Sequence, residues 1–177
     1  MPVEWVRGDV SEGESVMKGT VRNSCVAVLI GPVVMGVYLL SLFVGRTRAV
    51  EMVGPSVTRV SAAALRWFLV PRLGGAQEFG EFWPRMRRKL WLWRPLFDVA
   101  AEEATEDTVA LKLTNCPFCE VLQATGMGDL GMYVCEGDWV VARDNTGAWT
   151  FRRDHQIGTG DRFCDHTYSR IRTGSVD

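Results

Sequence analysis

The sequence predicts an α+β fold, in which N-terminal helices, one of them very apolar, pack on a small antiparallel sheet with short cysteine-bearing helices. Apolar residues recur at helical spacing as far as residue 94. Beyond residue 95, short segments alternate apolar and polar residues as strands do, and four of the five cysteines lie beside them. We therefore expect a single α+β domain over residues 15–171, with a helical part at 15–94 and a sheet and functional site at 95–171.

The overall composition sets the class of protein and excludes one kind of partner. The chain has 177 residues, of which 47% are hydrophobic and 23% charged, so it can bury a substantial core. Residues 1–14 are expected to be a flexible lead-in, and residues 172–177 a tail. The net charge of −1 gives no electrostatic basis for binding nucleic acid.

The first predicted helix is unusually apolar. The run from Cys25 to Val44 contains no charged residue, and Arg22, Arg46 and Arg48 flank it. Its length would span the hydrocarbon core of a bilayer, but Pro32 in the middle is expected to kink or break it. We favour a buried core helix or the interface of a homo-oligomer, with membrane association through residues 25–44 as the alternative.

Two further helical patterns follow at residues 47–52 and 55–70, with Pro55 suited to the first turn of the second. Residues 83–94 then combine three tryptophans with five basic residues. The favoured interpretation of this last segment is a helix whose tryptophans pack inward while its basic side chains reach solvent. A membrane-interface anchor or an anion site is the alternative.

Strand periodicity begins near residue 96. Residues 96–113 are expected to form two antiparallel strands joined by an acidic turn at Glu102–Asp107. A second hairpin is expected from the alternation that starts at Trp149 and from the returning segment 163–171. Because side chains alternate along a strand, Cys164 and Asp165 should point to opposite faces.

Two short helices are expected between these hairpins. Asn115 is the expected N-cap of the first, which places Cys116 and Cys119 on one face of its first turn, where free N–H groups favour a thiolate. The second, over residues 130–141, places Cys135 and Asp138 one turn apart. Thiols and carboxylates in this spacing suit nucleophilic and acid–base chemistry.

The cysteines leave three interpretations open. An odd number of cysteines without a secretory pattern favours reduced thiols in the cytoplasm. A metal or an iron–sulfur centre is an alternative cofactor, although the first pair lacks a second ligand motif; its candidate ligands are Cys116, Cys119, Cys135 and Cys164. In the third interpretation the thiols are buried and inert, in a non-catalytic dimerising or membrane-associated ligand-binding module.

The motifs in the second half occur together in a recognisable order. They are Cys116 with Glu120, glycines at 126 and 131, Cys135-Glu-Gly-Asp138, Phe151-Arg-Arg, and Gly160-Asp-Arg-Phe-Cys164-Asp165. Over roughly residues 45–170 this order resembles the L-2-amino-thiazoline-4-carboxylate hydrolase family. Two features depart from the family pattern: His166 stands where an aromatic residue is usual, and the N-terminal helix is unusually apolar.

The resemblance implies an α+β domain that hydrolytically opens a cyclic, sulfur-containing amidine. The catalytic candidates that it implies are Cys116, Cys135, Asp138, Cys164 and Asp165, and the candidates for binding substrate are Arg152, Arg153 and His155. The expected mechanism has the Cys116 thiolate attack the ring carbon C2, while Asp138 relays protons. Arg152 or Arg153 would pair with the substrate carboxylate.

Overall fold

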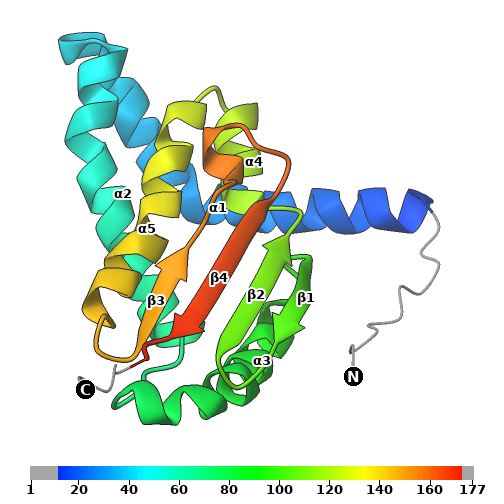
Figure 1. Cartoon of the computed structure of the whole chain (residues 1–177). Coiled ribbons are helices and arrows are strands. Elements are labelled where there is room, and N and C mark those ends of the chain that lie inside the picture. The colour runs from blue at the N-terminus through cyan, green and yellow to red at the C-terminus, as the bar shows by residue number, and fades with distance from the viewer. Residues whose placement is uncertain (1–11, 173–177) are drawn as a thin grey trace.

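A computed structural model describes the backbone of residues 12–172 and the side chains of residues 19–172. The helices are α1 (Glu12–Val44), α2 (Arg46–Phe68), α3 (Phe82–Trp93), α4 (Pro117–Ala124) and α5 (Gly131–Asp144), with short 3-10 helices η1 (Ala76–Glu81), η2 (Gly128–Leu130) and η3 (Ile157–Thr159). The strands are β1 (Val99–Ala104), β2 (Thr108–Leu113), β3 (Trp149–Arg152) and β4 (Cys164–Arg170). The predicted α+β class is confirmed (Figure 1).

The four strands form one antiparallel sheet in the order β1-β2-β4-β3. Both expected hairpins are present, but β1 continues through the acidic residues to Ala104, so the turn is shorter than predicted. Thr105 and Thr108 close this turn, because the Thr105 hydroxyl accepts the Thr108 N–H and the Thr105 N–H donates to the Thr108 carbonyl. The register between β1 and β2 shifts between Ala101 and Glu103.

One face of the sheet is covered by helices, which lie behind it in Figure 1. The core on this face is rich in aromatic rings, with Phe82 stacked on Phe79 and in contact with Trp149 and Tyr168. The inward residues of β4 are Cys164, His166 and Tyr168, whereas Asp165 and its alternate neighbours are half exposed. The predicted separation of Cys164 from Asp165 is therefore confirmed.

The predicted helices at 47–52 and 55–70 are a single helix, α2, which continues through the exposed Pro55. Tertiary packing overrides the local break signal, because Gly54 lies directly against the ring of Tyr133 on α5. Gly137 of α5 makes a second close approach, to Ser61 of α2. Small residues at both contacts let the two helices pack closely.

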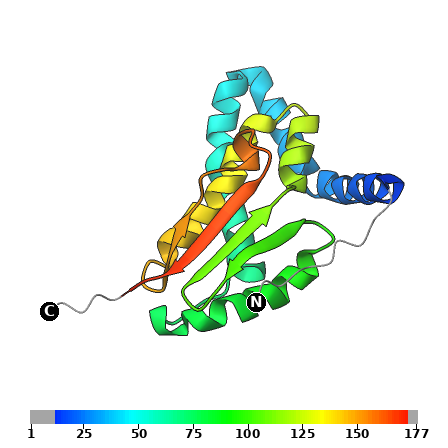
Figure 2. The same cartoon turned by 45° about the vertical axis from the view of Figure 1, so that its right-hand side comes forward.

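The structure overturns the expectation that α1 is a core helix. The helix begins at Glu12, three residues earlier than predicted; residues 1–11 of the expected lead-in and 173–177 of the expected tail lie outside the described residues. Pro32 does not break α1, although the helix changes direction partway along its length (Figures 1 and 2). By length and composition the segment Gly19–Val44 could cross a membrane, yet only 17% of its most apolar window is buried in the fold.

The tryptophans of α3 do not all pack inward as predicted. Phe82 and Met86, one turn apart, form the inward face of the helix and are fully buried. Trp91 lies off that face and exposes 67% of its surface, and its neighbour Leu92 exposes 66%. The inward positions of α3 are taken by other residues, so its C-terminal end presents apolar side chains to solvent.

Candidate active site

Four thiols gather where α4, α5, β4 and η3 meet. Cys119, Cys135 and Cys164 are buried together, and the half-buried Cys116 packs against them. The fifth cysteine, Cys25, lies exposed on α1, and all five thiols are free. Cys116 and Cys119 are neighbours in sequence, and the fold brings them together with Cys135 of α5 and Cys164 of β4.

The N-cap of α4 is Cys116, not Asn115 as predicted. Asn115 instead fixes the start of β1, because its side-chain amide donates to the Leu96 carbonyl while its oxygen accepts the Asp98 N–H. Pro117 then occupies the first helical position, where its missing N–H costs nothing. These contacts hold the entrance to α4 firmly beside the sheet.

Cys135 is the thiol that the cluster favours as a thiolate. Hydrogen bonds from the Cys119 and Cys164 thiols lower the pKa of Cys135 well below its usual range, and the charge of Arg153 and the Gly158 N–H act in the same direction against the effect of burial. The pKa values of the two donors shift the other way. The hydrogen bond with Cys116, then that with Cys135 and burial, raise the pKa of Cys119, and donation to Cys135 with burial raises the pKa of Cys164. The cluster thus favours the thiolate form at Cys135 over Cys119 and Cys164.

The η3 turn covers Cys135. A Cβ atom at Gly158 would lie 2.6 Å from the Cys135 sulfur, and one at Gly131 would lie 2.8 Å from the Gly158 carbonyl oxygen. The turn is also fixed to β4, because the Ile157 N–H donates to the Cys164 sulfur at 3.2 Å. Only 6% of the Cys135 surface is exposed beneath this turn.

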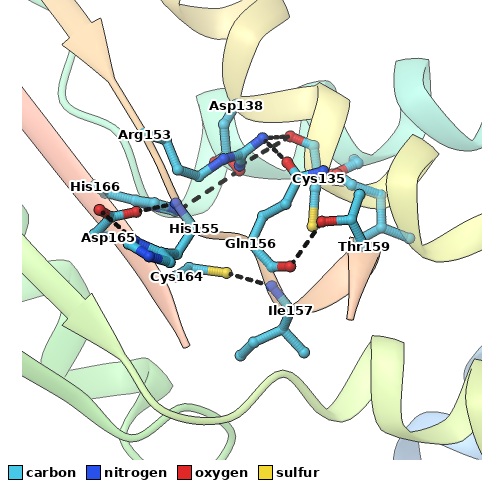
Figure 3. Close-up of polar contacts among 12 residues, drawn as sticks. Cys135, Asp138, Arg153, His155, Gln156, Ile157, Thr159, Cys164, Asp165 and His166 are labelled. Atoms are coloured by element: carbon cyan, nitrogen blue, oxygen red, sulfur yellow. Dashed lines mark hydrogen bonds and ion pairs between the residues drawn. The ribbon is translucent and has the colours of Figure 1, made fainter. Parts of the chain in front are cut away.

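A buried charged network adjoins the thiols (Figure 3). The guanidinium of Arg153 donates to Asp138 at 2.7 Å, to the Cys135 carbonyl at 3.2 Å and to Gln156 at 2.5 Å. The Arg153 and Asp138 side chains expose only 2% and 11% of their surfaces. Burial raises the pKa of Asp138, although the charges of His166 and Arg153 oppose that rise. Asp138 therefore holds its proton to a higher pH than an ordinary aspartate does.

His166 is the neighbour of this ion pair that the sequence did not single out as a site residue. It is buried on β4, with Nε2 3.8 Å from the Asp138 carboxylate and without a hydrogen-bond partner. Burial lowers the pKa of His166, which favours the neutral imidazole. The sequence could have identified His166 as a site residue through the alternation of β4. His166 is two residues from Cys164 and therefore lies on the same face of the strand.

The second histidine forms a separate and more exposed pair. Asp165 accepts the backbone N–H groups of Asp154 and His155 and lies 3.2 Å from the His155 ring. Partial burial opposes the charge of Asp165, but these hydrogen bonds prevail and lower its pKa. Arg152 also lies outside the cluster, with 76% of its side chain exposed, and pairs with Asp154.

The predicted site residues thus divide into two groups. The fold brings together Cys116, Cys119, Cys135, Cys164, Asp138 and Arg153, and adds His166, Gln156 and Gly158 to them. It places Asp165, His155 and Arg152 at the more exposed edge, so their assigned roles stay predictions. Among the side chains of residues 19–172, no three His, Cys, Asp or Glu are arranged to hold a metal ion. The thiols engage one another instead.

The surface depressions that accompany the fold lie away from the thiols. One of about 440 Å³ lies between α3 and β1, and one of about 670 Å³ lies between α1 and α4. Neither is lined by a cysteine, Asp138 or His166. Both depressions therefore lie apart from the thiol cluster, in which Cys135 is buried beneath η3.

The fold and the cluster together define a class: a small α+β protein with a stabilised thiolate beside a carboxylate and an imidazole, a combination suited to nucleophilic and hydrolytic chemistry. The family model described as L-2-amino-thiazoline-4-carboxylic acid hydrolase matches residues 40–168, and the chain belongs to this family. The resemblance predicted from the sequence motifs is confirmed. A search of curated proteins finds no match.

Proposed function

We propose that the protein is a hydrolase that opens a small cyclic sulfur- and nitrogen-containing substrate such as 2-amino-thiazoline-4-carboxylate. The family supports the reaction class, and the observation that carries the chemistry is the Cys135 thiol, held as a thiolate by Cys119 and Cys164. We assign the nucleophile to Cys135 and not to Cys116, because Cys135 is packed between the Cys119 and Cys164 thiols, which lower its pKa. A low pKa is what makes a cysteine an effective nucleophile near neutral pH.

The proposed reaction has two stages. The Cys135 thiolate adds to the electrophilic ring carbon C2, a proton passes to the ring nitrogen, and the ring bond from C2 to sulfur breaks to leave a substrate thiol and a covalent enzyme adduct. Water then adds to the same carbon, and the Cys135 thiolate leaves as the product acquires a carbonyl group. The sum is one water molecule consumed and one ring bond broken.

Asp138 and His166 supply the proton transfers in this scheme. The raised pKa of Asp138 lets it carry a proton, and His166, with its unpartnered Nε2, can accept one from the attacking water. Arg153 acts as a positioning residue, because its donors are already engaged by Asp138, Gln156 and the Cys135 carbonyl. The substrate carboxylate is then left to Arg152 and His155 at the exposed edge, a role that remains a proposal.

The test is turnover of 2-amino-thiazoline-4-carboxylate by the full chain, measured as release of free thiol. We expect Cys135→Ser to lose at least ~1,000-fold in kcat/KM, because serine is not ionised at neutral pH. The matched control is Cys25→Ser, which removes an exposed thiol on α1 and should leave turnover unchanged. If activity survives in Cys135→Ser and is lost in Cys116→Ser, the nucleophile is Cys116 and not Cys135.

A second proposal concerns the partner of α1, which we infer to be a second copy of this chain. Val21, Val28, Met35 and Leu42 are exposed and recur every seven residues, with the exposed Cys25, Pro32 and Leu39 between them. This alternating four-and-three spacing is that of a helix–helix seam, and an equal patch on each copy suits a two-fold pair.

Polar contacts favour a second copy over a bilayer as the covering of α1. Arg22 pairs with Glu120 near one end of the apolar segment, and Arg46 pairs with Asp129 just beyond the other. The Tyr38 hydroxyl donates to the Thr125 carbonyl between them. These contacts hold α1 against polar groups of α4 and the segment after it. If α1 spanned a membrane in this position, those polar groups would lie in lipid. We propose a cytoplasmic location, which the five free thiols support.

A further inference from the structure

A second unusual surface lies at the opposite end of α2 from α1, where α2 ends beside α3. The exposed residues Trp67, Phe68, Trp91 and Leu92 gather here, each with more than half of its surface in solvent. The Trp93 indole N–H donates to the Phe68 carbonyl at 3.1 Å and the two rings meet edge to face, which holds the helices together. We call these four residues, together with the Lys and Arg residues of segment 66–94, the α3 face. Figure 2 shows α3 along the lower edge of the molecule.

Charge is strongly segregated to the α3 face. Residues 66–94 contain seven Lys or Arg and two Glu, a net charge of +5, whereas the whole chain has a net charge of −1. The rest of the chain therefore carries −6. A basic segment in an otherwise acidic protein points to a partner that is negatively charged and contacts this face alone.

Two arginines of the α3 face have no ion-pair partner among the described residues. Arg66 and Arg85 pair with Asp144 and Glu78, but in the described part of the chain no ion pair engages Arg87 or Arg88. Both are exposed and line the depression of about 440 Å³. Its walls also include Trp83, Trp91, Arg94 and Phe97, and its floor is apolar, formed by β1.

We propose that the α3 face docks the protein on an anionic lipid membrane. Indole rings prefer the headgroup region, arginines bind lipid phosphates, and an apolar depression beside them accepts part of an acyl chain. Leu92 and Phe68 favour lipid over nucleic acid, because aliphatic and fully apolar side chains gain from insertion into a headgroup layer and offer nothing to a phosphate backbone. The inference is independent of the reaction at Cys135.

The experiment is sedimentation of the full chain with vesicles of phosphatidylcholine alone or of phosphatidylcholine with phosphatidylserine. Binding is expected only to the anionic vesicles, and it should weaken as salt is raised. The double variant Arg87→Glu/Arg88→Glu should reduce vesicle affinity by roughly 30-fold or more. Its matched control is Arg48→Glu/Arg59→Glu, which changes charge equally at exposed positions of α2 and should bind like the parent protein.

A second variant separates insertion from charge attraction. Trp91→Ala/Leu92→Ala keeps the charge of the α3 face and should still weaken binding, and the parent protein should show a blue shift of tryptophan emission on anionic vesicles that this variant reduces. Equal loss in both arginine pairs, or no binding to anionic vesicles, would overturn the proposal. Tighter binding to single-stranded RNA than to vesicles would assign the face to nucleic acid instead. Circular dichroism of each variant checks that the fold is retained.

Discussion

The thiol cluster and the outer surfaces of α1 and α3 depart from an ordinary globular protein in opposite directions. Around Cys135, charged and polar groups are buried, and almost every one has a partner within the protein. On α1 and at the end of α3, large apolar side chains are exposed and have no partner within the described residues. Buried charge is costly unless paired, and exposed apolar surface is costly unless covered. Most polar groups of the first region are satisfied within one chain, whereas the second region leaves apolar surface exposed.

The buried thiol cluster is the region expected to carry out chemistry, and the exposed surfaces of α1 and α3 are the regions expected to contact partners. A buried ion pair next to a thiolate contributes little net stability and is expected where proton transfer is needed. An exposed heptad seam or a basic aromatic face contributes nothing to the isolated fold and is expected where another surface docks. Variants in the two regions should therefore differ sharply in their effect on the isolated protein.

The largest effect on stability should come from Arg153→Met. Removal of the guanidinium leaves Asp138 buried without its cation, which should lower the free energy of unfolding by about 3–5 kcal/mol. The control is Arg153→Met/Asp138→Leu, which removes both charges and should recover much of the loss. Urea titrations measure both, and a single-variant loss below about 1 kcal/mol would contradict the buried pairing.

The same variant should show a defined pH dependence. In Arg153→Met the pKa of Asp138 rises further, so the folded state holds that proton more tightly than the unfolded state does. Stability then falls as pH rises from the ordinary aspartate pKa through the raised folded-state value. Urea titrations of Arg153→Met should show a larger loss at pH ~8 than at pH ~5, and a loss that is independent of pH would argue against an ionised Asp138.

An intermediate effect is expected from Gly158→Ala. The added methyl group would press on the Cys135 sulfur and on Gly131, which should cost about 1–3 kcal/mol and displace the η3 turn. Alkylation of native Cys135 should then become faster, as followed by mass spectrometry. Gly147→Ala is the matched control, because a Cβ there meets nothing within 4 Å. Unchanged alkylation in Gly158→Ala would mean that η3 does not control access.

The reactivity of Cys135 offers a test that leaves the fold unchanged. Because its pKa is lowered, Cys135 is already ionised at neutral pH, and its alkylation rate should stay nearly constant between pH ~6 and ~8. A cysteine in a short unstructured peptide should instead slow by about tenfold for each pH unit below its pKa. If the alkylation rate of Cys135 falls with pH as that of the peptide does, the hydrogen bonds from Cys119 and Cys164 do not stabilise a thiolate.

The smallest effect on the isolated fold should come from α1. Val28→Lys/Leu42→Lys changes two exposed side chains, so the free energy of unfolding of the monomer should shift by less than about 0.5 kcal/mol per site. The molecular mass in light scattering should nevertheless fall from dimer to monomer. Val60→Lys, at an exposed apolar site on α2, should leave the dimer intact. If the parent protein is monomeric even at high concentration, the proposed dimer interface on α1 is wrong.

Sequence periodicity predicted the parts of the molecule that depend on local pattern. The alternation around Val109, Leu111 and Trp149 correctly indicated two hairpins, and it also separated Cys164 from Asp165. The continuity of α2 was missed, because the packing of Gly54 on Tyr133 joins segments far apart in the sequence. A local break signal cannot anticipate such a contact.

Other features depended on neighbours that only the fold supplies. The thiolate character of Cys135 arises from Cys119, Cys164 and Arg153, on three other segments of the chain, so spacing alone pointed to Cys116 instead. The expectation that α1 is a core helix was also wrong, and its alternative, a homo-oligomer interface, stays a prediction. Apolar composition indicates that a helix surface is covered but does not indicate what covers it. The order of the motifs did identify the family, because these motifs together include most of the cysteines that meet in the thiol cluster.

The contact between Glu120 and α1 has a consequence for communication between subunits. Glu120 follows Cys119 directly on α4, and its carboxylate accepts hydrogen bonds from Arg22 and Asn23 of α1. A helix of eight residues thus connects the proposed dimer seam to the thiol cluster. If pairing of two copies shifts α1, the shift acts on the donors that hold the Cys135 charge, and occupancy of one site would alter the affinity of the other by the same free energy in both directions.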